Sequence, residues 1–341
     1  MEVSLLSHVM GSISSAAIGA VARLGIADAL ADGPKTGAEI AETIEADPVS
    51  LESLMQAVAA LGIFTVDENR RYANTAASEQ LKSDHPQSIR HLASLICGLY
   101  GQAAAGGLAK AVKDGTAVMP AAFGVSLYEY LENDAETSRI FDLAMQDWSR
   151  PIGVVLAEHV PFENVRVVVD VGGGNGALLK TILAAHPHLH GVCVDRPDTC
   201  RRAEADLRAS GDEDLKQRLS YRPADILKEI PEGGDLYLIK NVLHDWSSES
   251  SVRILSNIRT AMAAGDDPTL LVIDPLAEHD SGAAFRNVIK MVVGETHARE
   301  RTEADIRREA ADAGLQVESI IPCPADLSVA TCKLAAAPAA V

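Results

Sequence analysis

Aromatic residues and positive charge are both scarce in this sequence of 341 residues. Phe, Trp and Tyr make up 4% of it, too few for the stacking platforms with which proteins bind single-stranded nucleic acids. Lys and Arg total 30 against 48 Asp and Glu, a formal net charge of -18. Such an acidic chain is poorly suited to a nucleic-acid backbone or an anionic membrane surface. We therefore expect no nucleic-acid partner and no membrane partner.

Long apolar runs and cysteine patterns are also missing. Gly, Asp or Lys interrupts each apolar run well before the ~18 residues that a transmembrane helix needs, so we expect no membrane span. The segment 1–20 lacks the basic region of a secretory signal. The 5 cysteines form no CxxC pair and no Cys/His metal pattern. We expect reduced thiols, no metal site and a cytoplasmic location.

The N-terminal region is predicted to be mostly helical and of winged-helix type. Thr36 and Glu39 form a capping box at the start of one helix, and a second helix covers 50–62. Two short strands follow, 63–66 and 71–73. This order of elements occurs in DNA-binding proteins. The recognition-type helix, however, carries Glu52 and almost no Arg or Lys, which favours a structural or dimerising role.

From about residue 160 the sequence alternates between predicted strands and helices. Short strands are expected at 165–170, 191–195, 219–222, 235–240 and 269–274. Helices are expected at 177–185, 199–209 and 247–264. This alternation predicts an α/β fold with a parallel sheet and helices on both faces. The strands 316–321 and 327–333 are joined by too few residues for a parallel crossover, so they should be antiparallel.

A glycine cluster joins the first of these strands to the first helix. Asp170 ends the strand, and Gly172, Gly173, Gly174 and Gly176 follow. Glycines at this point let the backbone approach a ligand at a helix N-terminus. A loose G-x-G-x-x-[GA] pattern also fits, so a dinucleotide site is an alternative. Asp170 would repel a pyrophosphate but could order the loop around a cationic ligand.

Acidic residues lie at the ends of the next two strands. A carboxylate at Asp195 can accept hydrogen bonds from both hydroxyls of a ribose. Asp225 could reach an adenine amino group, and the adjacent Ile226 could contact its ring. Each acid alone could be a helix cap or a solvated loop residue. Together, beside the glycine loop, they favour an adenosine site.

A histidine and two acids follow at the same predicted sheet edge. His244 lies just after the fourth strand, Asp274 ends the fifth, and Glu300 precedes the next helix. A neutral imidazole whose second nitrogen is fixed by a carboxylate is a competent base near pH 7. These three residues are therefore the candidate catalytic group.

Residues 10–335 resemble the S-adenosylmethionine-dependent small-molecule O-methyltransferases. This family is typified by plant caffeic acid and flavonoid enzymes and includes bacterial enzymes that tailor antibiotics and pigments. The resemblance rests on three stretches in order and spacing, Val169–Gly176, Leu243–Trp246 and Arg299–Thr302. It implies a class I methyltransferase domain with a seven-stranded, mostly parallel, Rossmann-like sheet whose last strand is antiparallel. It also implies a winged-helix-like dimerisation domain and an intertwined homodimer.

The resemblance divides the chain into four parts. They are a helical dimerisation domain at 1–90, a helical connector lining the substrate pocket at 91–155, the cofactor-binding catalytic domain at 156–335 and a flexible tail at 336–341.

The resemblance also implies which residues bind the cofactor. Gly172 would contact its methionine part, Asp195 its ribose hydroxyls, and Asp225 with Ile226 its adenine. Lys240 would contact the edge of the cofactor. The remaining candidates near it are Asp170, Gly174 and Trp246.

For catalysis, His244 matches the family's general base and Glu300 matches one of the two acids that orient it. Asp274 stands where the family often has a glutamate, and this shorter acid puts the second orienting contact in doubt. Candidate substrate contacts, for which core packing is an equal alternative, are Met145, Trp148, Asn287 and Met291.

The expected reaction is metal-independent methyl transfer to a hydroxyl of a small aromatic metabolite, such as a phenol, a polyketide or a phenazine. One alternative keeps the fold and cofactor but catalyses hydroxylation, decarboxylation or cyclisation. A second alternative is a winged-helix regulator that binds DNA.

Overall fold

A computed structural model of the chain describes residues 5–278, 282–323 and 327–336. Its contacts group these residues into two compact units. One unit contains the residues up to Gly106 together with Asn133–Trp148. The other contains Gly107–Glu132 and the described residues from Ser149 onward. The predicted connector at 91–155 contributes residues to both units, and the four-part division stays a prediction.

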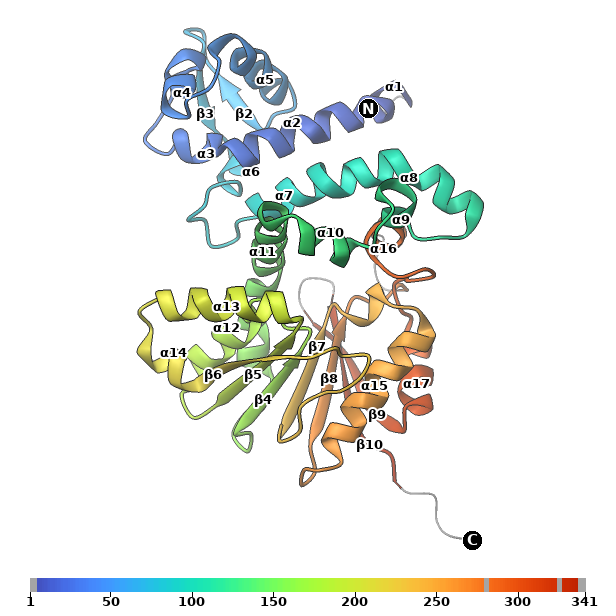
Figure 1. Ribbon diagram of the computed structural model, residues 1–341. Helices are drawn as coiled ribbons and strands as arrows, with labels where there is room; N and C mark the ends of the chain where they lie inside the picture. The colour runs from blue at the N-terminus through green and yellow to red at the C-terminus, as the bar shows by residue number, and fades with distance from the viewer. Residues whose placement is uncertain (1–4, 279–281, 324–326, 337–341) are drawn as a thin grey trace. The chain divides into compact units, whose positions relative to one another are not determined.

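The first unit begins with helices packed on a small antiparallel sheet (Figure 1). The helices are α1 (Leu5–Val9), α2 (Gly11–Leu24), α3 (Ile26–Ala29), α4 (Gly37–Thr43), α5 (Pro48–Ala60) and α6 (Ala76–Glu79). The strands β1 (Lys35–Thr36), β2 (Phe64–Val66) and β3 (Arg71–Asn74) pair in the order β1-β3-β2. The predicted capping box is present, because Thr36 and Glu39 bond reciprocally at the start of α4. Ile40, Met55 and Phe64 are buried in the core between these elements.

Further helices join this region to the large sheet along the chain. They are α7 (Arg90–Leu95), the π-helix η1 (Ile96–Tyr100), α8 (Gly101–Asp114), α9 (Val118–Phe123), α10 (Leu127–Asn133) and α11 (Ala135–His159). The stretch Arg90–Asp114 is one continuous helix, long and apolar enough by length and composition to cross a membrane. This corrects the expectation that polar interruptions rule out such a helix. A single helix of this kind is weak evidence for a span, because helices in soluble cores share its length and composition.

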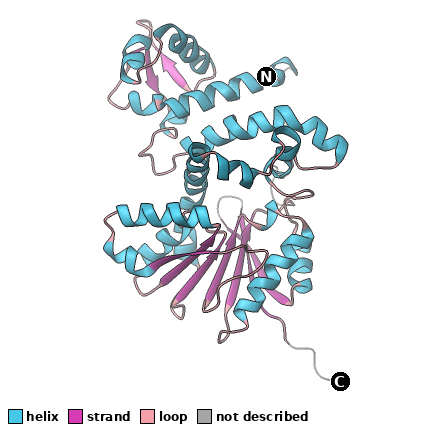
Figure 2. Cartoon of the chain, in the orientation of Figure 1, coloured by secondary structure: helices cyan, strands magenta, loops and turns pink. Residues whose placement is uncertain are grey.

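The second unit is built on a seven-stranded sheet with helices on both sides (Figure 2). Its strands are β4 (Val167–Val171), β5 (His190–Asp195), β6 (Leu219–Pro223), β7 (Leu236–Lys240), β8 (Thr269–Asp274), β9 (Leu315–Cys323) and β10 (Leu327–Leu334). Their order is β6-β5-β4-β7-β8-β10-β9. β10 runs antiparallel to both its neighbours, whereas the other pairs are parallel. The fold class and the antiparallel final pair are thus as predicted.

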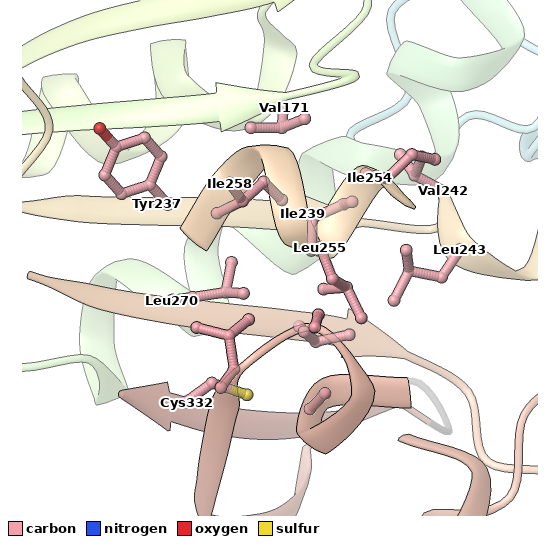
Figure 3. Packing of buried hydrophobic residues seen from close by; sticks show 14 of the residues in the cluster. Val171, Tyr237, Ile239, Val242, Leu243, Ile254, Leu255, Ile258, Leu270 and Cys332 are labelled. Atoms are coloured by element: carbon pink, nitrogen blue, oxygen red, sulfur yellow. The ribbon is translucent and has the colours of Figure 1, made fainter. Parts of the chain in front are cut away.

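The two faces of the sheet are covered by different helices. The helices that follow β4 along the chain are α12 (Ala177–Ala185), α13 (Pro197–Ala209), α14 (Glu213–Arg218), α15 (Ser248–Met262), α16 (Ala283–Val293) and α17 (Glu303–Asp312). Val169 and Val171 of β4 pack with α15 and α17, whereas Val168 packs with α12 and α13. Figure 3 shows the first of these layers, in which Ile239 of β7 lies against Ile254 and neighbouring residues of α15. Alternate residues of each central strand are therefore buried on opposite faces, as expected for a covered parallel sheet.

Candidate active site

The carboxyl ends of four adjacent strands bring the predicted site residues to one sheet edge. β5 ends at Asp195, β7 at Lys240 and β8 at Asp274, while Asp170 is the penultimate residue of β4. Since these strands are parallel neighbours, their ends lie side by side. This is the edge at which open α/β sheets bind ligands.

The loop after β4 has a backbone path that only glycine follows without strain. Gly172, Gly174 and Gly176 have φ values of 73, 60 and 77°. A Cβ atom on Gly172 would lie 2.7 Å from a methyl carbon of Val242. The loop is therefore a tight cradle of partly buried main chain leading into the N-terminus of α12.

Asp195 is held in place by this loop. Its Oδ2 accepts a hydrogen bond from the Gly174 amide at 2.8 Å, and its Oδ1 accepts one from the Arg196 amide at 2.8 Å. A carboxylate oxygen has two lone pairs, so each oxygen can accept another donor. Asp195 thus presents a fixed pair of acceptors beside the glycine loop, as a ribose diol requires.

Asp170, which is buried, and Lys240, which is half-buried, lie at the ends of the neighbouring strands β4 and β7. Burial raises the pKa of Asp170 to about 7, although the positive charge of Lys240 opposes the shift. Burial likewise lowers the pKa of Lys240 to about 8. Asp170 Oδ2 has no hydrogen-bond partner within the described ranges of the chain. An unpartnered carboxylate oxygen at this depth suits a ligand that brings a donor or a positive charge.

Asp225 and Ile226 follow β6 as predicted. Asp225 is exposed, pairs with Lys228 at 2.9 Å and accepts a hydrogen bond from the Leu227 amide. The hydrogen bond from Lys228 lowers the pKa of Asp225, although burial opposes the shift. Ile226 is partly buried against the core, and its carbonyl oxygen accepts a hydrogen bond from Asn257. Both residues already have structural partners, so their contact with adenine stays a prediction.

His244 lies in a short 3-10 turn, η2 (Leu243–Asp245), directly after β7. The residue is buried, and the structure brings the three predicted catalytic residues together. His244 Nδ1 lies 3.5 Å from Glu300 Oε2 and 3.6 Å from Asp274 Oδ1. Nε2 points the other way, 3.8 Å from Asp245 Oδ1. One ring nitrogen thus faces two acids, while the other can face a substrate.

The two acids at Nδ1 have different surroundings. Asp274 comes as near to the imidazole as Glu300, despite its shorter side chain. Burial raises its pKa to about 6, and neither of its oxygens has a hydrogen-bond partner among the residues described. Burial also opposes ionisation of Glu300, but His244, Lys290 and Arg286 together lower its pKa. Arg286 Nε pairs with Glu300 Oε1 at 3.2 Å.

The predicted substrate contacts fall in two places. Asn287 and Met291 lie on α16 in the unit that contains His244. Asn287 Oδ1 accepts a hydrogen bond from the Glu300 amide at 2.8 Å, so this side chain fixes Glu300. Met145 and Trp148 lie on α11 in the other unit. The role of all four in substrate binding stays a prediction.

Several residues at this edge escaped the sequence analysis. Tyr128 of α10 stacks on Trp246, with ring centroids 6.5 Å apart, and the Arg196 guanidinium lies 4.4 Å from the Tyr128 ring centroid. Arg196 directly follows Asp195, which was a signal available in the sequence. Nothing in the sequence linked Tyr128 to Arg196 and Trp246, which lie 68 and 118 residues further along the chain.

A buried arginine ties the catalytic segments together. Arg301 pairs with both carboxylate oxygens of Glu309 through Nε at 3.1 Å. Its Nη2 donates to the Trp246 carbonyl oxygen and to Ser251 Oγ. The Ser251 hydroxyl in turn donates to the Leu243 carbonyl oxygen. The turn that carries His244 is therefore anchored to the segment that carries Glu300.

Comparison with known proteins shows to which family the chain belongs. A family model described as an O-methyltransferase domain matches residues 106–316, and one described as an O-methyltransferase dimerisation domain matches residues 6–84. The chain belongs to the O-methyltransferase family. The resemblance stated from sequence is thereby confirmed.

Relatives of this O-methyltransferase match along nearly its whole length. O-methyltransferase SfmM3 of Streptomyces lavendulae is 35% identical over 93% of this chain and 96% of its own. O-demethylpuromycin-O-methyltransferase of Streptomyces alboniger is 32% identical over 93% of this chain and 84% of its own. The solved structure of the mitomycin 7-O-methyltransferase MmcR has a TM-score of 0.86 at 30% identity, covering 97% of each chain. These likenesses confirm the fold class predicted for this O-methyltransferase.

Proposed function

We propose that this chain transfers a methyl group from S-adenosylmethionine to a hydroxyl of a small aromatic metabolite, with His244 as general base and no metal. One observation carries the proposal. A glycine cradle with a fixed acceptor, Asp195, and a buried imidazole flanked by Asp274 and Glu300 lie on the same sheet edge.

The residues at this edge fit an adenosine cofactor that carries a positive charge. Asp195 would accept the ribose hydroxyls, and Asp225 with Ile226 would face the adenine. The amino-acid part would lie against Gly172 and Lys240, above the unpartnered oxygen of Asp170. Gly174 and Trp246 would complete the site. When bound, S-adenosylmethionine supplies an electrophilic methyl group on a sulfonium sulfur.

Solved relatives support this assignment of the cofactor. The neocarzinostatin O-methyltransferase NcsB1, at 28% identity and a TM-score of 0.81, is described in complex with S-adenosylmethionine and 2-hydroxy-5-methyl naphthoic acid. CalO1 of calicheamicin biosynthesis, at 29% identity, is described in a form with bound S-adenosylhomocysteine.

In the proposed mechanism, His244 Nε2 accepts the proton of the acceptor hydroxyl as the oxygen becomes nucleophilic. The imidazolium that results bears its other N–H toward Asp274 and Glu300, whose negative charges stabilise it. General-base assistance of this kind contributes about 10²–10⁴-fold in rate. The fixed protein groups contribute further by holding both reactants in register.

The names of the relatives support an aromatic acceptor. They include a phenazine O-methyltransferase of Lysobacter antibioticus and a 2,7-dihydroxy-5-methyl-1-naphthoate 7-O-methyltransferase of Streptomyces carzinostaticus. A phenol, polyketide or phenazine in specialised metabolism is thus the proposed substrate class. Met145, Trp148, Asn287 and Met291 are the residues proposed to contact it.

We also propose that the protein works as a homodimer in the cytoplasm. The match to a dimerisation domain covers 6–84. Leu5, Leu6, Val9 and Ile13 on α1 and α2 are exposed apolar residues in the isolated chain. Contiguous apolar side chains of this kind are typical of protein interfaces. We expect no nucleic-acid or membrane partner in addition.

The deciding experiment is a calorimetric titration with S-adenosylhomocysteine, with NAD in parallel, followed by labelled S-adenosylmethionine and a panel of phenols. Binding of S-adenosylhomocysteine alone and label transfer to a phenol are the expected results. Binding of NAD instead would reassign the glycine loop to a dinucleotide. Cofactor binding with conversion of an acceptor but no label transfer would indicate hydroxylation, decarboxylation or cyclisation.

A further inference from the structure

One face of α16 carries two cations that are withdrawn from solvent. The side chains of Arg286 and Lys290 are 17% and 11% exposed, whereas Phe285 and Val288 of the same helix are 80% and 40% exposed. Residues four apart lie on the same side of a helix, so the two cations point in one direction. Arg and Lys are rarely buried unless they are paired, so this placement needs a partner for each.

Each cation pairs with a different acid beside His244. Arg286 Nε lies 3.2 Å from Glu300 Oε1, and the other oxygen of Glu300 lies 3.5 Å from His244 Nδ1. Lys290 Nζ lies 2.9 Å from Asp245 Oδ1, the same oxygen that lies 3.8 Å from His244 Nε2. The helix therefore holds one acid on each side of the imidazole.

We propose that Arg286 and Lys290 are positioning residues that fix Glu300 and Asp245 and keep His244 in its neutral, proton-accepting form. We call these two cations the α16 clamp. The inference rests on the proposed role of His244 as general base, and it adds the device that keeps this base ready.

The charges that face His244 show why such a device is needed. They come from its own turn, from β8, from α16 and from the loop before α17, and comprise Asp245, Asp274, Arg286, Lys290 and Glu300. Lys240 of β7 contributes a positive charge that acts on Asp274. An acid within about 4–6 Å favours the protonated imidazole. Three uncompensated acids around a histidine would favour its protonated form, which cannot accept another proton.

The α16 clamp offsets two of these three acids. Glu300 and Asp245 each share an oxygen with a cation, which weakens the field that they exert on the ring. Asp274 has no hydrogen-bond partner among the residues that the structure describes. Asp274 then remains as the acid at Nδ1 that forms no ion pair with Lys or Arg among the described residues, and its charge stabilises the imidazolium that forms when His244 takes a proton from the acceptor.

The test follows the imidazole directly and needs no acceptor substrate. Protein containing ¹⁵N-labelled histidine is saturated with S-adenosylhomocysteine, and its ring signals are followed by NMR from pH 5 to 9. The His244 signal is assigned by its loss in His244→Gln. We expect Arg286→Gln and Lys290→Gln each to move the titration midpoint of this signal upward, by roughly half to one pH unit.

Charge-preserving and remote variants provide the controls. Arg286→Lys and Lys290→Arg should keep the midpoint within about 0.3 pH unit of the parent, because each retains the positive charge. Arg208→Gln removes a cation from an exposed pair with Glu204 on α13 and should leave the midpoint in place. It matches the change in net charge without touching the site.

The outcomes separate the proposal from its rivals. An unchanged midpoint in both Gln variants that still bind S-adenosylhomocysteine would overturn the clamp. Equal shifts in the Gln and the charge-preserving variants would also overturn it, because packing rather than charge would then be responsible. If a Gln variant does not fold, as judged by its thermal unfolding, the other Gln variant carries the test. Absence of methyl transfer with every phenol leaves the titration readable, so failure of the proposed function is recognised separately.

Discussion

The carboxylate of Asp195 accepts a hydrogen bond from the main-chain amide of Gly174 at 2.8 Å. The bond links the end of β5 to the glycine loop after β4. Asp195 is thus both a structural anchor of the loop and an acceptor with capacity left for a ligand. The two roles are separable by substitution, since an asparagine side chain keeps one oxygen acceptor and alanine keeps none.

Asp195→Ala should weaken S-adenosylhomocysteine binding by about 10- to 100-fold, because hydrogen bonds to a charged group contribute about 1.5–3 kcal/mol. Asp195→Asn should lose less of this affinity, because it keeps one oxygen acceptor. Calorimetric titration measures both. Asp198→Asn, on the first turn of α13, is the matched control and should bind like the parent protein. Unchanged affinity in Asp195→Ala would remove Asp195 from the cofactor site.

Cofactor binding should depend on pH through Asp170. Burial raises the pKa of this carboxyl to about 7, so it gains its negative charge as the pH rises through that value. Affinity for the positively charged S-adenosylmethionine should therefore increase several-fold between pH 6 and 7.5. Competition binding across this range measures the effect. In Asp170→Asn the slope should flatten, and an equal slope in the variant would contradict the assignment to Asp170.

The buried carboxyl of Asp170 should also lower the stability of the protein when no ligand is bound. The carboxyl of the unfolded chain has its ordinary pKa of 3.8, whereas burial raises the pKa of the folded one to about 7. Between these values the folded state binds more protons, so the free energy of unfolding falls as the pH rises. Asp170→Asn should accordingly raise the Tm at pH 8 and have little effect at pH 4. This comparison checks the binding result by an independent readout.

Gly172→Ala should weaken both the fold and the cofactor site. A Cβ atom at this position lies 2.7 Å from a Val242 methyl carbon, in addition to the strain of a φ of 73°. Gly211→Ala shares that strain, at a φ of 74°, but its Cβ would enter open space. Both should lose about 1 kcal/mol of stability from the backbone. Only Gly172→Ala should lose further stability from the clash with Val242, and only this variant should lose affinity for S-adenosylhomocysteine. Equal effects would show that the cradle tolerates a side chain.

The alternation of strands and helices made the sheet and its edge predictable from sequence. Parallel strands end at one edge, so Asp195, His244 and Asp274 could be brought together from their strand positions alone. The antiparallel pairing of the last two strands was predictable in the same way, because the five residues expected between them are too few for a parallel crossover. Such inferences depend on local pattern and chain connectivity.

Other features depend on how helices face their neighbours, which local pattern does not determine. Arg286 and Lys290 look like solvated charges in the sequence, yet they point inward onto Glu300 and Asp245. Asn287, which is proposed to contact the substrate, also accepts a hydrogen bond from the Glu300 main chain, a structural role that the sequence did not indicate. Tyr128 reaches the edge from a distant helix. Gly, Asp or Lys was expected to interrupt every apolar run, but Arg90–Asp114 forms one continuous apolar helix, because glycine in a helix costs only about 1 kcal/mol.

His244→Gln should lower kcat by about 10²- to 10⁴-fold, since the side chain that accepts the proton is lost. The affinity for S-adenosylhomocysteine should stay within about twofold, because His244 is not among the residues proposed to hold the cofactor. Label transfer under single turnover and calorimetric titration measure the two quantities. A variant with full turnover would mean that another group, or water, accepts the proton.

Asp274→Asn tests whether the carboxylate that lies 3.6 Å from His244 Nδ1 stabilises the imidazolium. Burial raises the pKa of this carboxyl to about 6, so it is charged at pH 8. Its replacement should then lower kcat by about 10- to 100-fold. As the pH falls through 6 the parent enzyme protonates Asp274 and loses the same assistance, so the gap between the two proteins should narrow. Single-turnover rates from pH 5.5 to 8.5 give both curves, with S-adenosylhomocysteine affinity as the check on folding. Parallel curves with a constant gap would indicate that Asp274 shapes the site without using its charge. Asp274 lies 3.6 Å from the ring and has no hydrogen-bond partner in the described part of the chain, so the two curves should instead converge in acid.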